Sequence, residues 1–209
     1  AAAADDDDDE EESKRGAAVK AFQLKYLLPF WALRCGYWMS GPYVFAAYSS
    51  KVFGGAPASL ALVSKIFLSG FLATALVGPI MGKASDRYGR KKGTLAFALL
   101  YGLGVTSIKS DLLWALFAGR ALVGVALSLL FCAPESWIVG EATRRNLSDA
   151  LGETFSLAYQ GDSIVAIAAG KLAGMAADAR GPTGPFDLSV VFLAAGAIVA
   201  GVAGGGGRG

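Results

Sequence analysis

Residues 82–92 constrain this chain more than any other segment, because six charged side chains fall within eleven residues between two long apolar stretches. Charges at that density are too costly to place in hydrocarbon. A short loop between two membrane-spanning helices accommodates both the charges and their apolar flanks. The segment therefore predicts a membrane protein whose second and third helices are joined by a basic loop.

Composition supports this prediction. The chain is 54% hydrophobic and 17% charged, whereas soluble domains carry about a quarter charged residues. Eight of the seventeen acidic residues lie within the first twelve positions, so the rest of the chain is more apolar than its average. This body is predicted to lie in a membrane rather than to form a large soluble core.

Six apolar segments predict the fold class, an all-α membrane protein with six transmembrane helices. A helix needs about 20 residues to cross a bilayer. The segments cover residues 22–48, 58–81, 94–108, 112–139, 150–177 and 186–203, which together form the bundle predicted for residues 22–203. We expect residues 1–21 to be a disordered acidic tail and residues 204–209 to be a flexible Gly-rich tail. In the fifth segment, Gly170 and Gly174 predict a close helix approach.

Basic residues set the expected orientation. With a cytoplasmic N-terminus, twelve lysines and arginines fall in inside segments and only Lys51, Lys109 and Arg180 fall outside. This is a positive-inside distribution. We therefore expect a multi-pass protein, in the plasma membrane, with both termini in the cytoplasm and the lipid bilayer as its first partner.

Several function classes are excluded. The chain has no histidine, and its two cysteines, Cys35 and Cys132, lie in apolar segments as small buried side chains. It shows no nucleophile–base pair, metal cluster or phosphate-binding loop, so we expect no enzyme activity and no cofactor. Its basic residues follow a membrane face, so we expect no nucleic-acid partner.

The basic loop resembles the loop signature of the major facilitator superfamily, with Gly82, Asp86, Arg87, Gly89, Arg90 and Lys91 at the signature positions. The resemblance implies two six-helix halves, each built from two inverted three-helix repeats. This chain would be the N-terminal half, so a second six-helix half, or a partner subunit, is implied. The loop itself is implied to be a gate that latches one conformational state. Gly82 and Gly89 are expected to permit its turn and a close approach of helices.

A partner for this gate is expected on the fourth helix. Glu135 and Glu141 are predicted near the same end of the bundle as Arg87 and Arg90. We expect Glu135, or in second place Glu141, to form an ion pair with one of these arginines.

Three further stretches resemble the molybdate-anion transporter family of the superfamily. They are residues 37–45, the stretches 119–124 and 128–137 of the fourth segment, and residues 154–157. Two positions depart from the family pattern. Tyr37 stands where an acidic residue usually precedes Trp38, and Pro134 stands where phenylalanine is usual. Pro134 is expected to kink the fourth helix.

Charged residues within the apolar segments are candidates for substrate binding or coupling. Arg34, Lys65 and Arg120 suit an anion, and Arg120 with Arg34 would neutralise it, because an arginine fork binds oxyanions well. Asp162 is expected to pair with Arg34 or Arg120, so a structural ion pair is an alternative to substrate contact for Arg120. The superfamily resemblance implies proton coupling as a third role for Arg120. For Lys65, snorkelling to the interface is the favoured alternative. Tyr37 and Trp38 are further candidates for substrate binding or coupling. Trp38, Tyr43 and Phe45 could line a cavity, with ordinary packing as the favoured alternative.

Three functions remain open from the sequence. The first is a secondary transporter, or its N-terminal half, that moves a small oxyanion such as molybdate by alternating access. The second is a proton-coupled facilitator for another solute, such as a sugar or a drug. The third is a half-length membrane protein that assembles with other subunits and does not transport.

Overall fold

Helices make up almost all of the computed structural model, which describes the backbone of residues 2–203 and the side chains of residues 10–203. The long helices are α1 (Ala2–Ser40), α3 (Leu60–Tyr88), α4 (Arg90–Thr106), α5 (Leu113–Leu130), α6 (Ala133–Arg144), α7 (Leu151–Arg180) and α8 (Gly184–Ala203). Shorter elements join them: the 3-10 turns η1 (Gly41–Tyr43), η2 (Ser107–Lys109) and η3 (Ser148–Ala150), the helix α2 (Val44–Ser49), and the hairpin strands β1 (Val52–Phe53) and β2 (Ala56–Pro57). The predicted Gly-rich tail, residues 204–209, lies outside the described residues.

Each of the six predicted apolar segments is helical, and two of them are divided: the first by η1, between α1 and α2, and the fourth between α5 and α6. The second division falls at Phe131 and Cys132, between α5 and α6. Pro134 occupies the first turn of α6, where its missing N–H costs no hydrogen bond. The expected kink in the fourth helix is therefore confirmed.

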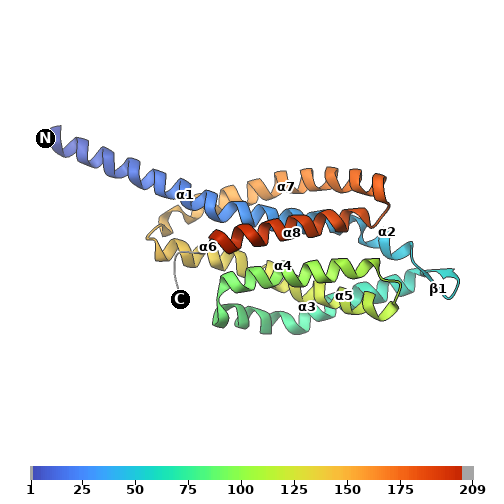
Figure 1. The fold of residues 1–209 in the computed structure, drawn as a ribbon. Coiled ribbons are helices and arrows are strands. Elements are labelled where there is room, and N and C mark those ends of the chain that lie inside the picture. The colour runs from blue at the N-terminus through green and yellow to red at the C-terminus, as the bar shows by residue number, and fades with distance from the viewer. Residues whose placement is uncertain (1, 204–209) are drawn as a thin grey trace.

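The N-terminal segment differs from the prediction. Residues 2–21 continue α1 as one helix instead of forming a disordered tail, and Figure 1 shows this part projecting beyond the bundle. Acidic side chains near a helix N-terminus interact favourably with the helix dipole, and alanine has the highest helix propensity. Lys14 and Glu10 lie one turn apart, and their ion pair at 2.8 Å further stabilises this part of the helix.

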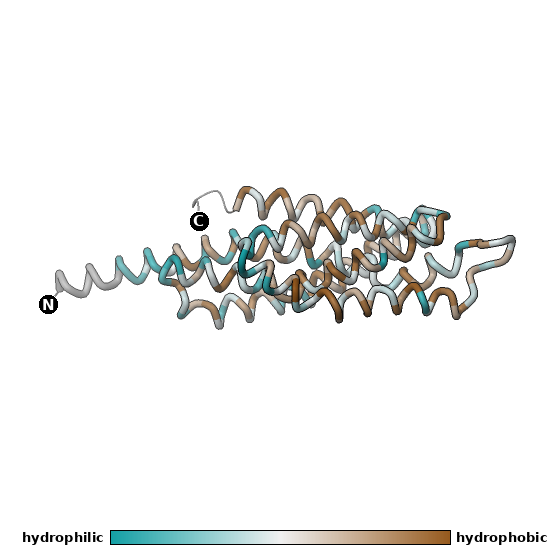
Figure 2. Tube along the Cα trace, turned by 90° about the horizontal axis from the view of Figure 1, so that it is seen from below, coloured by the Kyte–Doolittle hydropathy of each residue, from teal (hydrophilic) through white to brown (hydrophobic). Residues whose placement is uncertain are grey.

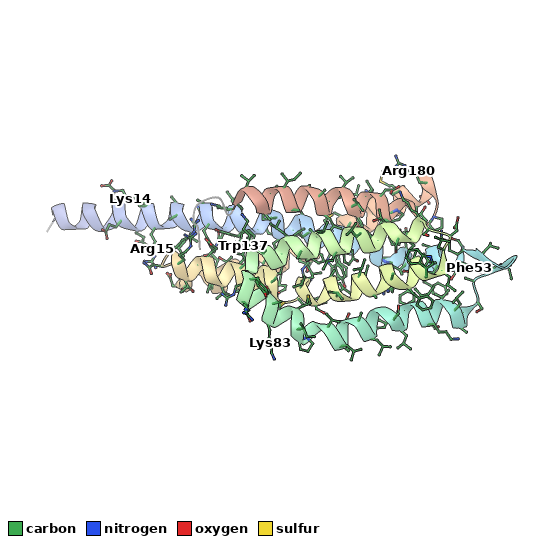
Figure 3. All side chains as sticks on the ribbon, turned by 60° about the horizontal axis from the view of Figure 1, so that its bottom comes forward. Lys14, Arg15, Phe53, Lys83, Trp137 and Arg180 are labelled. Carbon is green, nitrogen blue, oxygen red and sulfur yellow. The ribbon has the colours of Figure 1, made fainter. Side chains whose placement is uncertain are left out.

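The helices pack in the spatial order α7, α1, α8, α4, α5, α3, with α6 against α4 (Figure 1). One end of the bundle carries the α3–α4 turn, and we call it the loop end. The opposite end carries the β1–β2 hairpin, and we call it the hairpin end. Figure 3 shows Lys83 and Arg15 toward the loop end and Phe53 and Arg180 at the hairpin end.

Three helical segments are long and apolar enough to cross a membrane, counted among the described residues: α3, the α5–α6 unit and α8. Figure 2 shows hydrophobic positions along the whole bundle and hydrophilic ones on the projecting part of α1. Many large apolar side chains face outward, among them Leu76 at 72% and Ile167 at 77% exposure. Outward-facing apolar side chains are expected of a surface that contacts lipid.

Glycines allow α3 and α5 to meet closely. A side chain on Gly124 of α5 would collide with the backbone carbonyl of Gly70 in α3. The hydroxyl of Thr74 bridges the two helices by donating to the Gly124 carbonyl at 2.9 Å. The close approach predicted for the fifth segment is wrong: a side chain on Gly170 would meet open space, and one on Gly174 would meet only the Tyr43 hydroxyl.

Candidate functional site

The turn of the signature loop depends on Gly89. This residue follows α3 with φ of 109°, which disfavours any side chain, and its N–H donates to the Ser85 carbonyl at 3.0 Å. Gly82 lies inside α3, and a side chain there would meet nothing within 4 Å. The expectation that Gly82 also serves the turn is therefore wrong in this conformation.

The charged residues of the loop contact α6 and α8 through backbone carbonyls. Arg90 lies 3.5 Å from Asp86 and donates to the Ser136 carbonyl of α6 at 3.3 Å. Gly140 leaves room for the guanidinium, since a Cβ there would lie 2.9 Å from it. Lys91 donates to the Gly201 carbonyl near the end of α8 at 2.7 Å. Arg87 remains exposed, with its guanidinium beside the ring of Tyr88.

The predicted partners of the gate have other partners in the structure. The Glu141 carboxylate accepts from Tyr26 at 2.7 Å and from Arg144 at 2.5 Å. Glu135 accepts from the Tyr159 hydroxyl at 2.6 Å. No ion pair among residues 10–203 joins either acid to Arg87 or Arg90, so the predicted pairing is wrong here. For Glu141, a partner one turn away on its own helix costs less ordering entropy than one across a loop.

Arg34 lies between two carboxylates from different helices. Its Nη2 lies 3.8 Å from Glu135 of α6, and its Nη1 lies 3.7 Å from Asp162 of α7. The Arg34 side chain is only 7% exposed, and Trp38 of α1 donates to the other oxygen of Asp162 at 2.9 Å. The prediction that Asp162 pairs with Arg34 or Arg120 is confirmed for Arg34.

This cluster, which we call the Arg34 cluster (Arg34, Glu135, Asp162, Trp38 and Tyr159), holds two carboxylates and one guanidinium. The rings of Phe30 and Phe131 flank the Arg34 guanidinium at 5.2 and 5.8 Å. Because two acids already offset the charge of Arg34, the cluster offers no net positive charge to an anion. The expectation that Arg34 helps to neutralise a bound anion is not supported by this arrangement.

Arg120 differs from Arg34 in having no carboxylate partner among residues 10–203. The Arg120 guanidinium lies over the Phe67 ring, 4.6 Å from its centroid. The buried Nε of Arg120 has no hydrogen-bond partner among residues 10–203. It borders a cavity of about 10 Å³ that is also lined by Ser40, Tyr48 and Tyr101. That volume is enough for about one water molecule. The structural ion pair between Arg120 and Asp162 is therefore not formed.

Tyr37 connects the two arginine sites. Its ring packs against Trp38 and Phe131 beside the Arg34 cluster, at 5.0 and 6.4 Å, and against Tyr101 beside Arg120, at 6.1 Å. Lys65, by contrast, is exposed on α3, away from the two arginine sites.

Sequence reasoning missed Tyr159. This tyrosine lies three residues before Asp162 on α7, so the two share a helix face. That spacing, beside an acid already singled out, is the signal that could have identified it. Its hydroxyl is the shortest contact of Glu135 in the cluster.

Comparisons with known proteins agree with these features. A transporter family described as sugar transporters with twelve transmembrane segments matches residues 5–203. A molybdate-anion transporter of Xenopus tropicalis is 29% identical over 180 residues, which are 84% of this chain and 39% of that protein. One of Takifugu rubripes is 30% identical over 177 residues, covering 83% of this chain and 35% of that protein. No solved structure matches.

The apolar helices and these relatives define an integral membrane protein of the transporter class. The chain belongs to the twelve-segment family of the major facilitator superfamily that its residues 5–203 match. It spans no more than 39% of the length of the curated relatives given above.

Proposed function

We propose that this chain is one six-helix half of a secondary transporter that moves a small oxyanion, most directly molybdate, by alternating access. The likeness to molybdate-anion transporters over 84% of the chain is the observation that carries the proposal. Their greater length supports a second six-helix half, or a partner subunit, that completes the cavity.

The helix packing supports six membrane crossings in two inverted repeats. Inverted repeats pair the first, second and third helix with the fourth, fifth and sixth, namely α1 with α5–α6, α3 with α7, and α4 with α8. Under this exchange the α3–α5 contact becomes the α7–α1 contact, and the α1–α8 contact becomes the α5–α4 contact. All four contacts are among the most extensive in the bundle.

Arg120 is the proposed contact for the anion. Arg120 brings a positive charge that no described carboxylate offsets. Its buried Nε–H donates no hydrogen bond to any described group. Ser40, Tyr48 and Tyr101 border the same cavity and carry hydroxyl groups. A tetrahedral oxyanion is larger than this cavity, so binding requires the site to open, as alternating access provides.

The test is uptake of labelled molybdate by cells expressing the natural full-length protein. Arg120→Ala is expected to abolish most uptake above background, and Arg120→Lys to recover only part, because a lysine lacks the bidentate fork. Lys65→Ala is the matched control, since it removes an exposed basic residue of the same bundle. Equal uptake by wild type and Arg120→Ala would remove Arg120 from the site, and no wild-type uptake would overturn the molybdate assignment.

A proton-coupled facilitator for a sugar or drug is the second candidate. The family description favours a sugar, and the Arg34 cluster carries one more negative than positive charge, which a proton could offset. Uptake of a labelled sugar that rises with an inward proton gradient, without molybdate uptake, would favour it. A half-length assembly subunit, the third alternative, requires a natural chain that ends after α8.

Orientation follows from the same proposal. We propose that the protein lies in the plasma membrane, with the loop end and both termini in the cytoplasm. The excess of basic residues predicted on that side supports this orientation.

A further inference from the structure

The helices α4 and α8 are tied together at both ends by charged side chains. At the loop end, Lys91 near the start of α4 donates to the Gly201 carbonyl near the end of α8. At the hairpin end, Asp187 near the start of α8 forms an ion pair with Lys109, just beyond the end of α4. Arg180 lies 3.9 Å from the same carboxylate. If α4 and α8 are exchanged, the position of each of these contacts therefore maps onto the position of the other.

The turns beside these contacts share two backbone features, a glycine with positive φ and a hydrogen bond from its N–H, although their lengths differ. Gly181 follows α7 with φ of 75°, as Gly89 follows α3 with φ of 109°. Each glycine N–H donates to the carbonyl four residues earlier, Ala177 or Ser85, at 2.8 and 3.0 Å. An aspartate, Asp178 or Asp86, comes directly after each of those carbonyl residues. The turn at the hairpin end thus repeats the glycine and aspartate spacing of the signature loop, although its ion pair uses Asp187.

The contact between α4 and α8, which we call the α4–α8 seam, is incompletely filled at its middle. An open apolar groove of about 350 Å³ runs between the two helices, lined by residues such as Leu99, Gly102 and Ala194. Apolar side chains in a membrane gain little from packing on each other, because lipid tails are equally apolar. The polar ties at the two ends therefore carry a larger share of what holds the seam closed.

We propose that Asp187, Lys109 and Arg180 form a second clamp, the counterpart of the signature loop at the opposite end of the bundle. Each clamp holds its own end of the α4–α8 seam closed. Both contacts lie within this six-helix bundle, so the clamp does not rest on the proposed function. The ion pairs are partly exposed, with Lys109 at 49% and Asp187 at 34%, so they bias an equilibrium rather than fix it.

The test compares thiol labelling at the two ends of the seam in the full-length protein in nanodiscs, after Cys35→Ala and Cys132→Ala. Val105→Cys reports the hairpin end, because Val105 of α4 borders the same small cavity as Phe186 of α8, and Ala197→Cys reports the loop end, because Ala197 of α8 lines the groove together with Leu95 of α4. Asp187→Asn is expected to speed maleimide labelling at position 105 about two- to fivefold and to leave labelling at position 197 unchanged. Lys91→Gln is expected to give the reverse pattern.

Asp111→Asn is the matched control, because it breaks a hairpin-end ion pair, Lys51–Asp111 at 2.9 Å, that does not involve α4 or α8. The proposal is overturned if Asp187→Asn acts no more strongly than Asp111→Asn, or if either variant speeds both ends equally. Labelling needs no substrate, so the expected pattern without any solute uptake would support the clamp and count against transport.

Discussion

At the residue scale, Arg34 and Arg120 carry the same side chain but have different partners. Both are arginines within apolar segments, and their neighbours in the sequence do not distinguish them. In the structure, Arg34 sits between Glu135 and Asp162, while Arg120 stacks on Phe67 with no described acid beside it. Partner charges, which come from distant parts of the chain, distinguish Arg34, which lies between two acids, from Arg120, whose charge no described carboxylate offsets.

Removing the charge of Arg34 is expected to destabilise the bundle. Arg34→Gln leaves two carboxylates without their shared cation, which costs about 3 kcal/mol for a buried pair. Arg34→Gln combined with Asp162→Asn is expected to recover part of that loss. Thermal unfolding in detergent measures both, with exposed Lys65→Gln as a control. Strictly additive losses in the double variant would contradict the pairing.

Gly124 is expected to tolerate no side chain. Gly124→Ala forces a methyl group against the Gly70 carbonyl and is expected to cost about 1–3 kcal/mol of unfolding free energy. Gly170→Ala is the matched control, because its side chain meets open space on an exposed helix and gains helix propensity. A similar melting temperature for the two variants would show that α3 and α5 are not in close contact.

At the element scale, the helices were easier to predict than their ends. Apolar segments located all six long helical stretches, and Pro134 located the break in the fourth. The start of α1 was missed because a run of acidic residues looks disordered when read alone. In the structure, Arg15 of this segment donates to Asp149 in η3 at 2.6 Å, a contact between residues far apart in sequence.

That contact predicts a pH dependence. The hydrogen bond from Arg15 holds the pKa of the Asp149 carboxyl below its ordinary value. The contact therefore favours the docked α1 segment above the unfolded pKa of about 3.9 and is lost as the pH falls through the lower folded value. A spin label at Glu12→Cys should gain mobility only below about pH 4.

Asp149→Asn should make this label mobile already at neutral pH, whereas Glu153→Gln, a nearby exposed acid, should leave the pH response unchanged. A label whose mobility is the same in wild type and Asp149→Asn would show that Arg15 and Asp149 do not hold α1 in place.

For the whole molecule, the sequence predicted the helices and the loop signature, because both depend on local patterns of charge and hydropathy. It did not predict which charges meet. The expected ion pairs of Glu135 and Glu141 with Arg87 or Arg90 are not formed. Glu135 contacts Tyr159 and Arg34 instead. Glu141 contacts Tyr26 and Arg144. Such choices depend on helix rotation and packing, which a single sequence does not specify.

The central claim is that this helical bundle crosses a bilayer with its two ends on opposite sides. It is tested most directly in sealed, oriented vesicles containing the full-length protein without its native cysteines. A membrane-impermeant maleimide should reach Tyr88→Cys, next to Gly89, from the cytoplasmic side only, and Asp178→Cys, next to the α7–α8 turn, from the outside only. Labelling of both positions from the same side would contradict the claim.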